Sequence, residues 1–150
     1  MKELLKKNIA KHISLSDEET NEFCDLFETR HINKKEYLLR EGEICNFEGF
    51  VAKGLFRVYH LDADGFEHVL YFAIENWWIT DIDSFTNERP SSLFIEAIEE
   101  CEVLLISKKN KELVYRSIPA IEKLFRVMTQ KTHVSLQRRM IDNLTQLAYY

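Results

Sequence analysis

The sequence predicts an α+β fold: a jelly-roll β-barrel with helices at its N-terminal end and one long helix at its C-terminal end. Apolar residues keep helical spacing over roughly the first thirty residues, alternate with a period of two to about residue 107, and then return to helical spacing. About eight short strands with no long helix between them are typical of an antiparallel jelly roll, not of a parallel α/β sheet.

The chain begins with a predicted helical lead over residues 1–30. Leu4, Leu5, Ile9 and Ile13 keep helical spacing. Residues 16–19 (SDEE) form a capping box, in which the Ser16 hydroxyl accepts from the backbone three residues on while Glu19 reaches back. A second helix is therefore expected to begin directly after Ser16.

Residues 31–107 are expected to form the barrel, because short apolar segments alternate there with turn signals. The predicted strands contain residues 37–39, 49–51, 55–61, 66–74, 92–98 and 102–106, and the turns contain residues 41–43, 53–54, 62–65, 75–76 and 87–91. Between them, residues 80–92 form the longest segment without a regular pattern, rich in polar side chains. A long polar loop in a compact barrel is a common ligand position.

Residues 108–150 are expected to form a short helix and a long dimerisation helix. Ser107 is a plausible N-cap for a helix over residues 108–116, and Pro119 suits the start of the last helix. Apolar positions cover more than one face of that last helix, so one face can pack on the barrel while another contacts a second copy. We therefore expect a homodimer, and its interface stripe recurs every seventh residue: Val127, Val134, Ile141 and Ala148.

Composition limits the function classes. The 150 residues include 20 Lys and Arg against 25 Asp and Glu, a formal charge of −5, which is the wrong sign for a surface that neutralises many phosphates. The three cysteines, Cys24, Cys45 and Cys101, have no metal-site or disulfide spacing and are expected to be reduced and mostly buried. No signal peptide or membrane-length apolar segment occurs, so we expect one cytoplasmic domain over residues 1–150 that does not contact a membrane.

Catalytic motifs have little support, and we do not expect an enzyme. The sequence contains no nucleophile elbow, P-loop or dinucleotide fingerprint. A cupin-like metalloenzyme would need His60 and His68, on the two arms of one hairpin, to share a site with a carboxylate such as Glu67. Neighbours in a strand point to opposite faces, which separates Glu67 from His68, so half-exposed strand histidines without a metal are the favoured interpretation.

These segments, in this order, resemble the effector domain of the Crp/Fnr family of bacterial transcription regulators, and especially its Bacteroidetes-type branch. The resemblance is carried by residues 37–43 (YLLREGE), 50–58 (FVAKGLFRV), the hairpin at 62–65 (DADG), residues 71–79 (YFAIENWWI) and the Ile118-Pro119 pair. It implies a double-stranded β-helix of the cyclic-nucleotide-binding type, which is a cupin-like fold, followed by a dimerisation helix.

The resemblance also assigns the ligand-binding residues, and here the sequence departs from the family. Cyclic-nucleotide binders of this family read F-G-E-L and, about ten residues later, R-S/T-A; backbone N–H groups and the Arg hold the phosphate, and the Glu takes the ribose hydroxyl. The corresponding residues here are Thr80, Asp81, Ser91 and Ser92, with Arg89 as the nearest arginine. In the long helix, Leu136-Gln137 replaces an adenine-contacting Thr/Ser pair.

We therefore predict a pocket that is degenerate for cyclic AMP and that holds a cyclic nucleotide in an altered manner, another small anion, or no ligand. The resemblance implies the sensor and dimerisation domain of a regulator, in which DNA is contacted only through a C-terminal helix-turn-helix that this chain does not contain. The alternative is a stand-alone regulatory module that acts on a partner protein.

Overall fold

The computed structural model describes residues 2–149, and side chains are described for residues 2–146. Its elements are α1 (Lys2–His12), α2 (Asp17–Asp25), β1 (Glu28–Ile32), β2 (Tyr37–Leu39), β3 (Phe47–Lys53), β4 (Phe56–Leu61), β5 (Glu67–Ala73), β6 (Trp78–Ile79), α3 (Ile82–Asn87), β7 (Phe94–Ala97), β8 (Cys101–Ser107), α4 (Lys108–Ser117) and α5 (Ala120–Tyr149).

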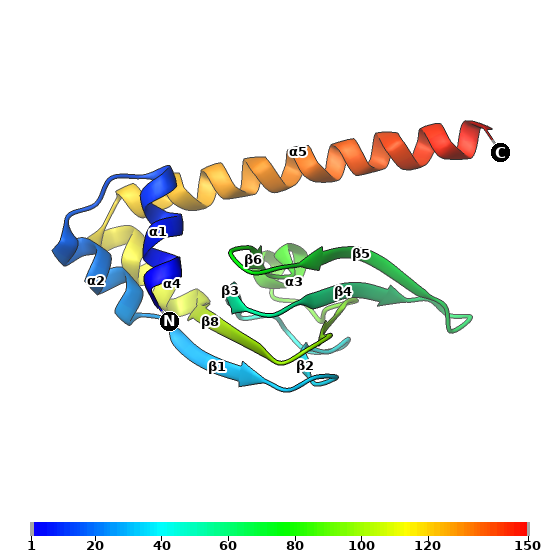
Figure 1. Ribbon diagram of the computed structural model, residues 1–150, viewed down its shortest axis with the longest axis horizontal. Coiled ribbons are helices and arrows are strands. Elements are labelled where there is room, and N and C mark those ends of the chain that lie inside the picture. Colours follow the sequence, from blue (N-terminus) through cyan, green and yellow to red (C-terminus); the bar gives the residue numbers. More distant parts are fainter. Residues whose placement is uncertain (1, 150) are drawn as a thin grey trace.

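The strands form two antiparallel four-stranded sheets, as the sequence predicts. One sheet has the order β1-β8-β3-β6 and the other β2-β7-β4-β5. Figure 1 shows the helices α1, α2 and α4 gathered at one end of the barrel, while the β4–β5 hairpin projects at the other. The jelly roll with terminal helices and a long C-terminal helix is confirmed.

Two hydrophobic cores share the strands β3 and β8. Side chains alternate between the two faces of a strand. Val51, Val103 and Leu105 accordingly lie in the core between the sheets. Phe50 and Leu104 point the other way and pack against the helices. The helices therefore cover the outer face of the first sheet, and they hold α5 against the barrel.

Local signals in the sequence have the expected effect. The Ser16 capping box has both of its hydrogen bonds, and Ser107 caps α4 by accepting from the Asn110 N–H. Gly54 has a φ of +97°, and an added Cβ there would lie 2.6 Å from the Cys101 sulfur. Only glycine fits this turn. All three cysteines are reduced and buried, and burial raises the pKa of the Cys24 and Cys101 thiols.

Two boundaries differ from the sequence prediction. The helical lead ends at Asp25 instead of residue 30, because Glu28–Ile32 pairs with β8 as an edge strand. The segment 80–92 is not irregular, since it contains α3. Both errors involve short segments without a clear period, in which tertiary pairing or a cap decides the structure.

The helix α5 runs for 30 residues and leaves the helical cluster on the side of the barrel that carries β5 and β6 (Figure 1). Its first turns are buried, with Ile121 and Leu124 fully covered, whereas residues 129–146 are all exposed. Of the predicted dimer stripe, Val127 is half-buried and Val134 and Ile141 are exposed. Ala148 lies outside the side chains that the structure describes.

No helix within residues 2–149 combines the length and the apolar composition needed to cross a membrane.

Candidate functional site

The segment of residues 80–92, here called the cassette segment, is built around α3. Asp81 has an extended backbone and its carboxylate accepts from the Ser84 N–H, so it is the N-cap of this helix. The helix ends at Asn87, and its C-cap Glu88 has a φ of +54°, in the left-handed region. The segment is therefore an ordered strand–helix–strand connection within the barrel.

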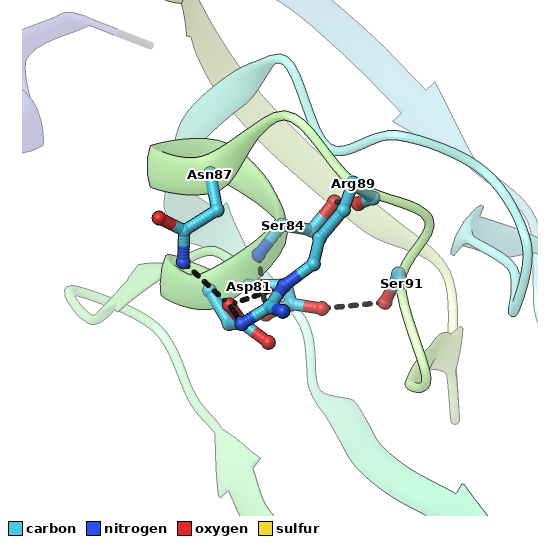
Figure 2. A network of polar contacts seen from close by, with 6 residues as sticks. Asp81, Ser84, Asn87, Arg89 and Ser91 are labelled. Carbon is cyan, nitrogen blue, oxygen red and sulfur yellow. Dashed lines mark hydrogen bonds and ion pairs between the residues drawn. The ribbon is translucent and has the colours of Figure 1, made fainter.

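Asp81 and Ser91 are bonded to each other (Figure 2). The Ser91 hydroxyl donates to the Asp81 carboxylate over 2.5 Å, and both residues are buried. The same hydroxyl oxygen accepts from the Leu93 N–H. The family resemblance assigns Asp81 to the ribose contact and Ser91 to the phosphate contact. In this chain the two side chains form a hydrogen bond with each other instead.

The side chains of Thr80 and Ser84 in the cassette segment also form hydrogen bonds within the protein. The Ser84 hydroxyl donates to the Arg89 carbonyl and accepts from the Cys45 N–H. The Thr80 hydroxyl donates to the Phe47 carbonyl over 2.8 Å. Among residues 2–146, no buried side-chain nitrogen or oxygen lacks a hydrogen-bond partner. The cassette segment therefore contains no buried side-chain donor that is left unpaired and could bind an anion.

Arg89 and Ser92 lie on the outside. The Arg89 guanidinium donates twice to the Asp83 carboxylate, and the Arg89 side chain is 64% exposed. The hydrogen bond from Arg89 is the first cause that lowers the pKa of Asp83. Ser92 is exposed, and its backbone carbonyl accepts from His60 Nδ1. Of the five predicted ligand-binding residues, the structure joins only Asp81 and Ser91 directly.

Tyr71 covers the cassette segment from β5, and the sequence analysis missed it. Its hydroxyl donates to the Thr80 carbonyl over 3.3 Å. Burial, and next the negative charge of Asp81, raises the pKa of Tyr71 to about 12. The phenol therefore stays neutral and remains a hydrogen-bond donor. No local pattern marks this residue, because its partner Thr80 lies nine positions away, after β6.

The histidine pair of the β4–β5 hairpin does share one register position, with His60 directly opposite His68. Each ring is already bonded elsewhere: His60 contacts the Ser92 carbonyl and His68 contacts the Asp62 carboxylate over 2.7 Å. Glu67 pairs instead with Arg57. Within the described residues, no three His, Cys, Asp or Glu side chains gather as a metal site.

A pocket of about 630 Å³ lies between α1, the β5–β6 turn and α5, and is here called the outer pocket. It is lined by Asn8 and His12 of α1, by side chains within residues 71–78, and by one face of α5 from Met128 to Arg139. Tyr71 reaches it, but none of the five predicted ligand-binding residues does. Leu136 faces this pocket, whereas Gln137 does not line it.

Comparison with protein families gives one match: residues 29–116 match the cyclic nucleotide-binding domain. The chain belongs to this family. A search of curated protein sequences found no match. The family resemblance predicted from the ordered motifs is thereby confirmed at the level of the domain.

Solved structures share the fold of this cyclic nucleotide-binding domain. A cyclic nucleotide-binding domain from Methylobacillus flagellatus has a TM-score of 0.77 at 16% identity, over 93% of this chain and 83% of that one. The sensor domain of the transcriptional regulator DNR from Pseudomonas aeruginosa has a TM-score of 0.70 at 18% identity, over 93% of this chain and 90% of that one. The Thermus thermophilus catabolite activator protein has a TM-score of 0.71 at 19% identity, over 88% of this chain and 61% of that one.

The structural neighbours of the domain thus include transcription regulators of the Crp/Fnr family. The chain spans about three fifths of the length of the Thermus protein. Within residues 2–149, α5 is the last element.

The helix α3 is the feature of the site that sequence reasoning could have found. Asp81 is a good N-cap residue, and Asp83 lies in the first turn, where a negative charge is favourable. The contact between Asp81 and Ser91 has no such local signal, because it depends on how the chain folds back after α3.

Proposed function

We propose that the chain is the sensor and dimerisation portion of a Crp/Fnr-type transcription regulator, with a barrel site that is degenerate for cyclic AMP. Membership of the cyclic nucleotide-binding domain family and the fold shared with regulators support a regulatory role. We assign no catalytic activity to it. Contact with DNA would require a further module C-terminal to α5.

The buried hydrogen bond between Ser91 and Asp81 carries the proposal of a degenerate site. Proteins bind a cyclic phosphate through bidentate hydrogen bonds from an arginine guanidinium and through backbone N–H groups. Ser91 has no guanidinium to make such a bidentate contact, and its hydroxyl already donates to the Asp81 carboxylate. The negative charge of Asp81 would also repel a phosphate placed beside it. Arg89 is engaged by Asp83 on the surface.

The exposed half of α5 supports dimerisation. Val134 and Ile141 are 50% and 53% exposed, and with Val127 they recur at the seven-residue spacing of a helix pair. Leu144 and Met140 are also exposed on this helix. Burial of such a stripe against a second α5 would remove apolar area from water, at roughly 25 cal/mol per Å². Ala148 would continue the same stripe.

The first experiment titrates the chain with cyclic AMP and cyclic GMP by calorimetry. We expect no heat of binding from the natural sequence at micromolar protein concentration. A reconstructed variant that combines Thr80→Gly, Asp81→Glu and Ser91→Arg restores the family's contact groups and should gain affinity for cyclic AMP. A matched control, Asp83→Glu, changes an exposed carboxylate outside the pair and should gain none. Micromolar binding by the natural sequence would contradict a degenerate site.

The second experiment measures mass in solution by light scattering across a concentration series. We expect a dimer that Val134→Glu dissociates, because a charge in the stripe would lose its water on association. Thr129→Glu, on a different face of the exposed part of α5, is the control and should remain dimeric. A monomer at all concentrations would remove the basis for a dimeric regulator and favour a module that acts on a partner protein.

A further inference from the structure

A separate pocket opens between the edges of the two sheets and is here called the edge pocket. The strand β1 is at the edge of one sheet and β2 at the edge of the other. The edge pocket has a volume of about 280 Å³ and is lined by Glu28 and Arg30, by side chains within residues 38–47, and by Leu105 and Ser107. Figure 1 shows β1 and β2 on the opposite side of the barrel from α5. We propose that the edge pocket binds a small zwitterion, an α-amino acid with an apolar side chain.

The base of the edge pocket is apolar. The side chains that form it belong to the core between the sheets and are buried: Leu38, Leu39, Phe47 and Leu105. An apolar ligand side chain that covers this base leaves water, and the gain in affinity grows with the area that it buries. The volume of the pocket lies just below the range that holds drug-sized molecules, which suits a ligand as small as one amino acid.

The edge strand β1 places two charged side chains at the mouth of this pocket. In the ladder with β8, Glu28 is opposite Leu105 and Arg30 is opposite Val103, and both of these β8 residues point into the core between the sheets. Directly opposed residues point to the same face of a sheet, so Glu28 and Arg30 also point to the inner face. Their side chains are 69% and 45% exposed. They therefore form a polar opening above the apolar base.

The opening carries charges of both signs that the fold pairs only weakly. The Arg30 guanidinium donates to the Glu28 carboxylate over 3.5 Å, which is a long contact. Glu43 also lines the pocket and forms no ion pair with any described residue. A ligand carboxylate can accept from the guanidinium, while a ligand ammonium can donate to the two carboxylates. A ligand with both charges avoids the repulsion that a simple anion or cation would meet here.

The connection between β2 and β3 holds the polar groups of the opening in place. The Glu43 carboxylate accepts from the Arg40 N–H over 2.6 Å, and the Glu43 N–H donates to the Arg40 carbonyl over 3.1 Å. The Glu43 carbonyl accepts from the Ser91 N–H over 2.8 Å, and the Asn46 carbonyl accepts from the Lys108 N–H over 2.9 Å. The backbone around the pocket is therefore ordered before a ligand arrives, which lowers the entropic cost of binding.

The test titrates the isotope-labelled chain with L-leucine and two analogues, and follows the backbone amides by nuclear magnetic resonance. One analogue, 4-methylpentanoate, is leucine without its ammonium group, and the other, 3-methylbutylamine, is leucine without its carboxylate. We expect saturable shifts in β1 and residues 43–47, with a leucine dissociation constant on the order of 1 mM. Both analogues should bind at least about tenfold more weakly. Norleucine should bind about fourfold more tightly than norvaline, because it buries one more methylene group.

Matched variants locate the two charges of the ligand. Arg30→Gln should weaken leucine about tenfold and should not weaken the amine analogue. Glu43→Gln keeps the oxygen that accepts from the Arg40 N–H, and it should weaken leucine and the amine but not the carboxylate analogue. Arg40→Gln and Glu41→Gln remove equal charges from side chains that do not line the pocket, and neither should change leucine binding by more than about twofold. Asn46→Phe fills the pocket and should abolish binding, whereas Glu41→Phe should not.

Four results would overturn the proposal: no saturable shift up to tens of millimolar leucine, leucine binding no tighter than that of the analogues, equal effects of Arg30→Gln and Arg40→Gln, or undiminished binding by Asn46→Phe. The proposal does not rest on the proposed function, because neither the cassette segment nor the dimer stripe contains a residue that lines the edge pocket. Failure here would leave that function standing, and the calorimetric test of cyclic AMP leaves this proposal untouched.

Discussion

The cassette segment and the outer pocket both carry polar side chains, and they differ in how those polar groups are paired. In the cassette segment, Asp81 and Ser91 are buried and bonded to each other. In the outer pocket, Lys131 and Arg139 have no carboxylate partner among the described residues. Buried polar groups that are hydrogen-bonded to each other stabilise the fold, whereas charged groups without an ion-pair partner beside an apolar cavity are available to a ligand.

This difference predicts that substitutions in the cassette segment change the stability of the fold, while those in the outer pocket change ligand binding. The position of a family's ligand residues in sequence is thus not sufficient to locate a binding site. The partners that those side chains have in the folded chain decide whether they are available.

The largest effect is expected at the buried ion pair that joins α4 to β3. Lys111 Nζ lies 2.5 Å from Glu48 Oε1, both residues are buried, and the ammonium also lies over the Phe85 ring of α3. Glu48→Ala should lower the free energy of unfolding by about 3 to 5 kcal/mol, because it leaves the lysine charge buried without its partner. Urea unfolding measures this change.

The double variant Glu48→Leu with Lys111→Met is the control for this prediction. It removes both charges and fills the space with apolar groups, and should recover most of the lost stability. If the double variant were as unstable as the single one, packing and not the unpaired charge would explain the loss.

Asp81→Ala tests the closed pair itself. The substitution removes the N-cap of α3 and leaves the Ser91 hydroxyl without its acceptor, so we expect a loss of about 2 to 3 kcal/mol in thermal or urea unfolding. Asp81→Asn keeps a capping oxygen and should lose less. A stability equal to that of the natural sequence would mean that the pair is not closed in solution.

The pH dependence of stability tests the cover over the cassette segment. The folded state raises the pKa of Tyr71 to about 12, above its ordinary value near 10. The neutral phenol therefore stabilises the fold below about pH 10, and this contribution is lost as the pH rises through 12.

By pH 11 we expect a loss of about 1 kcal/mol from this residue in urea unfolding. Tyr71→Phe should remove that part of the alkaline decline. Comparison with the variant is needed because burial also raises the pKa of Tyr59 and Tyr115. A decline of the same size in Tyr71→Phe would assign it to those residues instead.

The smallest effect is expected at Arg89. Its ion pair with Asp83 is exposed, and such pairs contribute little to stability. Arg89→Ala should leave thermal unfolding unchanged within error, and it should also leave the reconstructed cyclic AMP site intact. A loss of cyclic AMP binding in the reconstructed variant would show instead that Arg89 turns inward to the ligand.

The sequence by itself determined the features that depend on neighbours a few residues apart. The Ser16 and Ser107 caps, the turn at Gly54 and the start of the long helix after Pro119 all follow from local hydrogen bonding or backbone preference. The order of the strand segments was sufficient to predict the domain family.

Only the tertiary structure decided which polar groups meet. The bond between Asp81 and Ser91, the outward turn of Arg89 and the contact between Asn8 and Trp78 join residues from 6 to 70 positions apart. Strand periodicity also could not predict the edge strand β1, since it is short and depends on pairing with β8. Local interactions fix which elements form, but the path of the chain fixes which side chains pair and which remain available to a ligand.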